Sequence, residues 1–220
     1  KVVYQDEKCA TVDLTKRTHM ELARLQSHPN EWQARHARRV LQERLAKLSH
    51  GKEFTQADAI LKNQLATAKT IALRLRALWA LHVTQGLSES DLLALLKDPD
   101  PNLRAWSIQL LCETQKPSPS ALNEFSRLAR EDQSPFVRMY LASAMQRTPI
   151  PQRTPVLTAL LTHAEDANDP NLPHLYWYAT EPVIAANKTT DLAILRVAGK
   201  GYTPLPVATV AGPAPPPFAR

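Results

Sequence analysis

Four arginines on one basic segment are the side chains whose type and spacing point most directly to binding. Arg35, Arg38, Arg39 and Arg44 lie in WQARHARRVLQER, where apolar residues recur every three to four positions, as they do on a helix. Guanidinium groups on a solvent-facing helix can dock on an acidic protein surface or neutralise phosphates. We expect these four to form a docking face, for a protein first and for nucleic acid as the less favoured partner.

The excess of positive over negative charge lies in this region of the chain. Nine lysines or arginines and three acids lie between Lys16 and Lys52, whereas the rest of the chain carries 18 of each. A basic, solvated helix face has the same composition without any binding role. Only Trp32 is interleaved with these bases, and this disfavours binding of single strands by base stacking.

Other reactive side chains lack the spacing that chemistry requires. The seven histidines form no HExxH motif, and no CxxC or CxxCH occurs. Glu165, Asp166 and Asp169 are close in sequence but lack the spacing and glycine of a calcium loop. GxSxG, P-loop and GxGxxG motifs are also missing. We expect no catalytic, metal or cofactor site in this segment.

The cysteines and aromatic residues have both structural and functional readings. Cys112 falls on an apolar helix face, which favours a buried free thiol, although a disulfide with Cys9 stays possible. The tryptophans recur near the starts or middles of the second helices and could form a groove for a base or peptide. Packing between layers is the more frequent role of such rings. We assign Trp79, Trp106, Trp177 and Tyr178 to packing.

The elements that would position these residues follow one repeated pattern, clearest in residues 92–145. An apolar run meets a proline-bearing break, and Leu103-Arg104 or Val137-Arg138 then opens a second apolar run. Two helices joined so tightly lie antiparallel, and each buries its apolar stripe only against neighbouring hairpins. This predicts an all-α protein, an α-solenoid of about five HEAT-like hairpins.

The predicted solenoid covers residues 15–198, between an extended lead-in at 1–14 and a proline-rich tail at 199–220. With 18 prolines against 5 glycines, the chain favours helices stopped by proline. The expected helices are 18–26 and 31–49, 55–68 and 70–84, a pair around 88–111, a pair over about 118–147, then 156–165, 172–186 and a weak last helix at 190–197. No apolar run reaches the length of a membrane span, so we expect no membrane insertion.

The hairpins align on the arginine that opens each second helix: Arg35, Arg74, Arg104 and Arg138, at spacings of 39, 30 and 34 residues. This irregular period resembles that of HEAT repeats. In that family an acid at the turn between helices and the following arginine can pair between neighbouring repeats. Asp98 or Asp100 with Arg104, and Asp132 with Arg138, match this pattern, whereas the first two repeats lack the acid.

Three stretches carry a more specific resemblance: HPNEWQARHARRVLQER, LRALWALHVTQGL with DPDPNLRAWSIQLL, and DANDPNLPHLYWYATEPVIAAN. They resemble the HEAT-repeat part of large secreted proteins of planctomycetes and verrucomicrobia, described as membrane-bound dehydrogenases or PVC-type haem-binding proteins. There a propeller similar to quinone-dependent sugar dehydrogenases precedes the HEAT part, and a CxxCH haem domain follows it. The resemblance implies that KVVYQ is a closing propeller strand and that the chain is a piece of a longer extracytoplasmic protein.

The resemblance favours a non-catalytic scaffold that holds an oxidising domain near a haem domain. Its partners would be neighbouring domains or subunits of a redox assembly, and no cofactor would bind this segment. The alternative is a HEAT-like DNA-binding protein of the alkylpurine DNA glycosylase type, which is similar in architecture and charge. That activity requires a carboxylate beside an aromatic pair, and neither Trp79 nor Trp106 has an acid within one helical turn in sequence.

Overall fold

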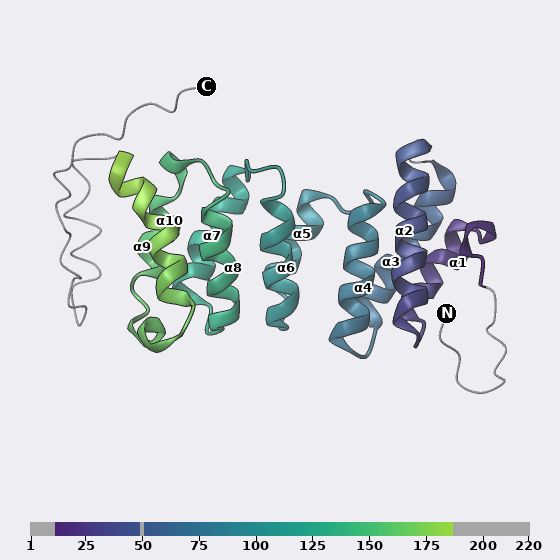
Figure 1. Ribbon diagram of the computed structural model, residues 1–220, viewed down its shortest axis with the longest axis horizontal. Helices are drawn as coiled ribbons and strands as arrows, with labels where there is room; N and C mark the ends of the chain where they lie inside the picture. Colours follow the sequence, from purple (N-terminus) through teal and green to yellow (C-terminus); the bar gives the residue numbers. More distant parts are fainter. Residues whose placement is uncertain (1–11, 49–50, 187–220) are drawn as a thin grey trace, which may run out of the picture.

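The computed structural model describes residues 12–48 and 51–186, and all of their regular structure is helical. The α-helices form five hairpins that lie side by side along the long axis of the molecule (Figure 1). These are α1 (His19–Arg24) with α2 (Glu31–Lys47), α3 (Lys52–Thr67) with α4 (Ile71–Val83), α5 (Glu89–Leu95) with α6 (Pro101–Leu111), α7 (Pro119–Glu131) with α8 (Pro135–Met145), and α9 (Thr154–Leu160) with α10 (Leu172–Ala186). The predicted all-α solenoid of HEAT-like hairpins is confirmed.

The hairpins stack in two layers. The second helices contact one another in succession from α2 to α10, and on the other side α1 packs on α3 and α7 on α9. The apolar stripes meet between the layers, where Phe54, Leu78, Phe125 and Leu141 are fully or almost fully buried. Because each core cluster takes residues from adjacent hairpins, no hairpin buries its apolar face alone.

Polar caps fix where the helices begin. Thr18 and Glu21 form a capping box at the start of α1, and Ser88 and Asp91 form one at α5. The first residues of α6, α7 and α8 are prolines, at a position where the missing N–H costs no hydrogen bond. The predicted start sites at Thr18 and Ser88 are confirmed, and the fourth hairpin, predicted to begin near Ser118 or Ser120, begins with the cap Ser118.

Buried ion pairs connect the last four hairpins in series. Three arginines each donate two hydrogen bonds to a carboxylate of the following hairpin: Arg74 to Asp98, Arg104 to Asp132, and Arg138 to Asp166. The same arginines also donate to main-chain carbonyl groups at the turn of their own hairpin or to the end of its first helix. This arginine–aspartate ladder sets the register of one hairpin on the next.

The ladder confirms pairing between neighbouring repeats, as the HEAT resemblance implied, but with other partners: Arg104 pairs with Asp132 rather than with Asp98 or Asp100, and Arg138 pairs with Asp166 rather than with Asp132. It also corrects the alignment of the first repeat. Arg104 and Arg138 lie four residues after the residue that caps their helix. Four residues after the cap Asn30 is the buried Ala34, and Arg35 lies one position further, on the solvent side. The ladder therefore has no arginine in the first hairpin.

Several predicted boundaries differ from the structure or fall outside it. The first helix of the last hairpin ends at Leu160 rather than Glu165, and a 3-10 helix at Ala164–Asn168 brings Asp166 to Arg138. Of the predicted lead-in 1–14, Leu14 begins a 3-10 helix, Leu14–Lys16, and is buried. Residues 1–11, the helix expected at 190–197 and the tail 199–220 lie outside the described residues.

Candidate functional site

The structure brings three of the four predicted docking arginines to one side of α2. Arg35 and Arg39 are exposed, and each pairs along the helix, with Glu31 at 3.2 Å and with Glu43 at 2.7 Å. Residues three and four apart share a helix face, so Arg38 lies on the same side. That the three residues dock on a partner stays a prediction.

Arg44 lies on the other side of α2 and has a structural partner. Arg44 lies nine residues after Arg35, and nine residues span two and a half helical turns, so the two side chains point to opposite sides. Its Nη2 donates to the main-chain oxygens of Thr15 and Arg17, at 2.8 and 2.7 Å. Arg44 therefore fixes the segment before α1 and does not belong to a common face with the other three.

Arg38 is the unusual member of the set. Its guanidinium lies over the ring of Trp79, 5.2 Å from the ring centroid, which is cation–π geometry. Its Nη1 atom is buried and has no hydrogen-bond partner. Burial lowers the pKa of Arg38, with Arg35 and Arg76 acting in the same direction and Glu31 against it. The side chain is thus a partly buried cation without an acceptor.

Glu31 is the carboxylate that the two arginines next to Arg38 share. Glu31 accepts from Arg35 and also forms an ion pair with Arg76, whose Nη1 donates to the carbonyl of His28 at 3.0 Å. This link joins the first two hairpins, where the arginine–aspartate ladder is missing. We call Glu31, Arg35, Arg38 and Arg76 the Arg38 cluster; its three guanidinium groups and one carboxylate leave it positively charged.

Aromatic side chains continue from the Arg38 cluster across the next three second helices. Trp79 of α4 meets Trp106 of α6 edge to face, with centroids 5.0 Å apart, and Trp106 lies 6.4 Å from Tyr140 of α8. Tyr140 in turn contacts Phe136 at 5.0 Å. All four rings are partly exposed, and we call them the aromatic row. The structure therefore aligns one cation and four rings along the layer of second helices.

The packing role predicted for the aromatic residues holds for some of them. Trp106 packs against the buried core cluster of the second and third hairpins. Trp177 and Tyr178 of α10 are instead about half exposed, at 51% and 56%, so they do not pack in the core of the described residues. Trp32 is also exposed and stacks on His36, with centroids 5.0 Å apart. Aromatic residues thus occupy the surface of α2 and α10 as well.

Chemically reactive groups elsewhere are held in structural contacts. Cys112 is a buried free thiol, as predicted, and burial raises its pKa to about 11. Cys9 lies outside the described residues. Within 12–48 and 51–186 no group of three His, Cys, Asp or Glu side chains could hold a metal ion. No helix in this part of the chain is long and apolar enough to cross a membrane.

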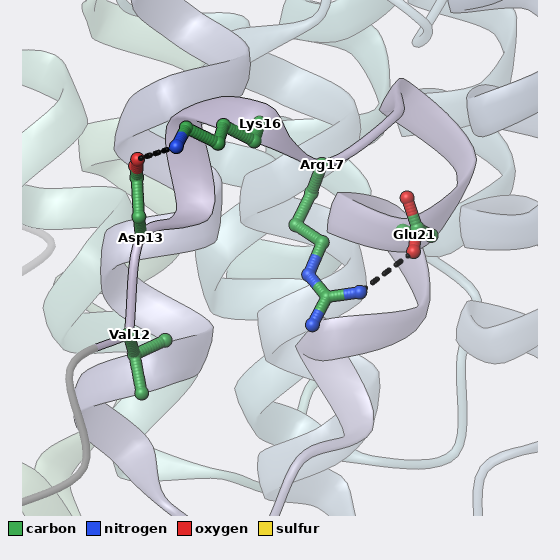
Figure 2. Close-up of a pocket in the computed structure, with 5 residues that line it drawn as sticks. All are labelled: Val12, Asp13, Lys16, Arg17 and Glu21. Atoms are coloured by element: carbon green, nitrogen blue, oxygen red, sulfur yellow. Dashed lines mark hydrogen bonds and ion pairs between the residues drawn. The ribbon is translucent and has the colours of Figure 1, made fainter.

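A shallow hollow near the start of α1 has no free reactive group. Figure 2 shows its lining residues: Val12, Asp13, Lys16, Arg17 and Glu21. Lys16 pairs with Asp13 at 3.7 Å and Arg17 with Glu21 at 2.9 Å, so the charges compensate one another. This hollow supports no chemistry beyond these local pairs.

Sequence reasoning missed four members of the candidate site, of which Glu31 was recognised only as the start of a helix. Arg76, Tyr140 and Phe136 lie on helices whose apolar pattern was recognised, but nothing distinguished them from other partly exposed residues. Counting from the helix caps would have found two of them, since Arg76 and Tyr140 lie six residues after Thr70 and Ser134, the caps of α4 and α8. Residues at the same distance from the cap thus occupy equivalent surface positions in neighbouring repeats, and the caps can be recognised in the sequence.

A family profile matches part of the chain. Residues 89–169, from α5 to the end of the 3-10 helix before α10, match the profile of HEAT repeats. This stretch is similar to HEAT repeats. The crystal structure of an engineered protein is similar at 14% identity and a TM-score of 0.43, over 82% of this chain and 93% of that one. No curated protein matches the chain.

Proposed function

We propose that this chain is a non-catalytic scaffold that binds partner proteins through its layer of second helices. The observation that carries the proposal is the alignment of Arg38 with the partly exposed aromatic row across α2, α4, α6 and α8. Aromatic and arginine side chains dominate the energetics of protein interfaces. HEAT repeats also present such extended surfaces on a rigid stack of hairpins.

We further propose that the scaffold serves an extracytoplasmic redox assembly, between a dehydrogenase domain and a haem domain. This proposal depends on the resemblance of three stretches to the HEAT part of such proteins. The chain has no CxxCH motif, so a covalently bound haem of such an assembly would belong to a different domain. The scaffold's own contribution would be shape and a docking face, with no titratable group taking part in a reaction.

Site-specific photo-cross-linking tests both levels of the proposal. A benzophenone amino acid replaces Tyr140 of the aromatic row or, as a control, the exposed Asn123 of α7 in the other layer. We expect a discrete protein adduct from position 140 and none from position 123, with the cross-linked peptide coming from a haem-bearing or dehydrogenase domain. Equal adducts at both positions, or none, would contradict the scaffold. An adduct with an unrelated protein would overturn the redox assignment alone.

A further inference from the structure

We propose that the Arg38 cluster and the aromatic row bind an acidic, extended segment of the partner protein. A carboxylate of that segment would lie at Arg38, and apolar side chains would cover the row. This inference rests on the proposed scaffold function and names the chemistry of its partner. Its support comes from the missing acceptor at Arg38, the local charge, and the change from charged to apolar surface along the second helices.

Arg38 is an exception among the arginines of residues 12–48 and 51–186. Every other arginine there that is partly or fully buried donates a hydrogen bond to a protein oxygen; these are Arg44, Arg74, Arg76, Arg104, Arg127, Arg138, Arg147 and Arg153. Arg38 has its cation–π contact with Trp79 and no hydrogen bond. A partly buried guanidinium without an acceptor lowers stability, so a ligand that supplies an oxygen would recover free energy.

The surroundings of Arg38 favour an anion in particular. Arg35 and Arg76 already share Glu31, so two of the three positive charges are not neutralised within the Arg38 cluster. The indole Nε1 of Trp79 is a second buried donor without a partner. A carboxylate at Arg38 would accept from its guanidinium group and compensate its charge, whereas a cationic or purely apolar ligand would do neither.

The aromatic row beyond the Arg38 cluster favours apolar groups on the ligand. Beyond Trp79 the row consists of Trp106, Tyr140 and Phe136, and the nearby arginines of α6 and α8 are held by buried aspartates. Successive members of the row are 5.0 to 6.4 Å apart. Alternate side chains of an extended peptide lie about 7 Å apart on one face. A segment with an acidic residue followed by apolar residues at alternate positions therefore fits.

The same distribution disfavours nucleic acid as the ligand. A phosphate backbone presents negative charge at short, regular intervals, and its affinity depends on many cation contacts. Within the Arg38 cluster and the aromatic row, the cations without full compensation lie on α2 and α4, and the rest of the row carries rings. A single acidic position next to apolar residues matches this surface better than a continuous polyanion.

The test uses the full chain and a fluorescein-labelled peptide with the core Glu-Ser-Leu-Ser-Phe between Gly-Ser flanks. Fluorescence anisotropy gives its affinity for the unchanged chain, for Arg38→Met and for the matched control Arg130→Met, an exposed arginine of α7. A second peptide carries Gln in place of Glu. We expect Arg38→Met and the Gln peptide each to lose affinity by about tenfold or more, the equivalent of one charge-assisted hydrogen bond. Arg130→Met should change it less than about twofold.

The thermal midpoint separates loss of binding from loss of fold. Because Arg38 forms no ion pair, Arg38→Met should leave the midpoint unchanged or raise it. The inference is overturned if the Glu and Gln peptides bind equally, if Arg38→Met binds like the unchanged chain, or if a DNA duplex displaces the peptide. If the peptide fails while Tyr140 still cross-links to a partner protein, the scaffold function stands and the acidic chemistry is wrong.

Discussion

Arg104 of the third hairpin donates two hydrogen bonds to the carboxylate of Asp132 in the fourth, from Nε to Oδ2 at 2.7 Å and from Nη2 to Oδ1 at 2.9 Å. The Asp132 side chain is 3% exposed and that of Arg104 is 15% exposed. Asp132 Oδ1 also accepts from the main-chain N–H of Ser134, the cap of α8. One carboxylate thus fixes both the start of a helix and the stacking of two hairpins.

We predict that Asp132→Asn destabilises the chain by about 3–5 kcal/mol, because it leaves the Arg104 guanidinium partly buried without its counter-charge. Urea unfolding followed by circular dichroism measures the change. The double variant Arg104→Met with Asp132→Leu should recover most of the loss, since both charges are then removed. A loss below about 1 kcal/mol for Asp132→Asn would show that the pair does not hold the hairpins together.

An exposed pair gives the matched comparison. Arg39 and Glu43 lie 2.7 Å apart on α2, with side chains 72% and 50% exposed. Solvent screens such a pair, so Glu43→Gln should change the free energy of unfolding by less than about 1 kcal/mol. The difference between Asp132→Asn and Glu43→Gln in the free energy of unfolding measures how much burial adds to the contribution of an ion pair.

Gly86 allows a close approach of the chain to Asp58. A Cβ atom at Gly86 would lie 2.4 Å from Cγ of Asp58, a buried side chain that accepts from Thr84 Oγ1 at 2.6 Å. We expect Gly86→Ala to lower the free energy of unfolding by about 1–3 kcal/mol, because the Asp58–Thr84 contact must shift. Thermal unfolding measures it. Equal stability would mean that this turn is not tightly packed.

The neighbouring Gln85 is the control for this turn. It has a φ of 58°, in the left-handed region that glycine adopts without steric cost. Gln85→Gly should therefore leave stability within about 1 kcal/mol of the unchanged chain. A large loss here as well would indicate that the turn tolerates no substitution of any kind, and the Gly86 result would lose its meaning.

The lowered pKa of His19 predicts that the free energy of unfolding falls in mild acid. Burial lowers the pKa of His19, Arg44 acts in the same direction, and Glu53, 2.8 Å from Nδ1, opposes them; the buried Nε2 has no partner. The folded pKa thus lies below the unfolded value of about 6.5, and the unfolded chain binds more protons in between. The free energy of unfolding should fall as the pH drops through and below this value.

Urea midpoints between neutral pH and mild acid measure this dependence. Because other histidines also titrate, the comparison is with His19→Gln, which should show a smaller fall over the same range. An identical pH dependence in both proteins would exclude His19 as the source. A stability that rises toward acid in the unchanged chain alone would contradict the sign of the argument.

The thiol of Cys112 should be unreactive in the folded chain. Burial raises its pKa to about 11, so almost no thiolate is present at neutral pH. In a Cys9→Ser background, we expect a disulfide reagent to label Cys112 only as fast as the protein opens, and completely in denaturant. Rapid stoichiometric labelling of the folded protein would show that the helix face around Cys112 is open.

The sequence predicted the elements well because they depend on local patterns. The spacing of Thr18 and Glu21, and of the apolar residues in 31–49, follows from the geometry of a single helix. The register of the first repeat was not predictable in this way. Arg35 and the buried Ala34 are adjacent in sequence, and only the cap at Asn30 decides which of them faces the next hairpin.

The candidate site was predicted only in part, for a related reason. The basic character of α2 is visible in the sequence, but the missing acceptor of Arg38 is not. Arg76 lies forty-five residues after Glu31 in sequence, and its ion pair with Glu31 occupies the carboxylate on the same side of α2 as Arg38. Asp166 was recognised only as a member of an acidic cluster, because its pairing with Arg138 depends on the 3-10 helix after α9.

The central claim is that the second helices bind an acidic protein segment. Competition between the Glu peptide and a DNA duplex, measured by fluorescence anisotropy from low to physiological salt, tests it most directly. We predict that the peptide stays bound at physiological salt and that the duplex binds weakly, with an affinity that vanishes there. Sub-micromolar binding of the duplex at physiological salt with a steep salt dependence, together with release of the peptide, would contradict the claim.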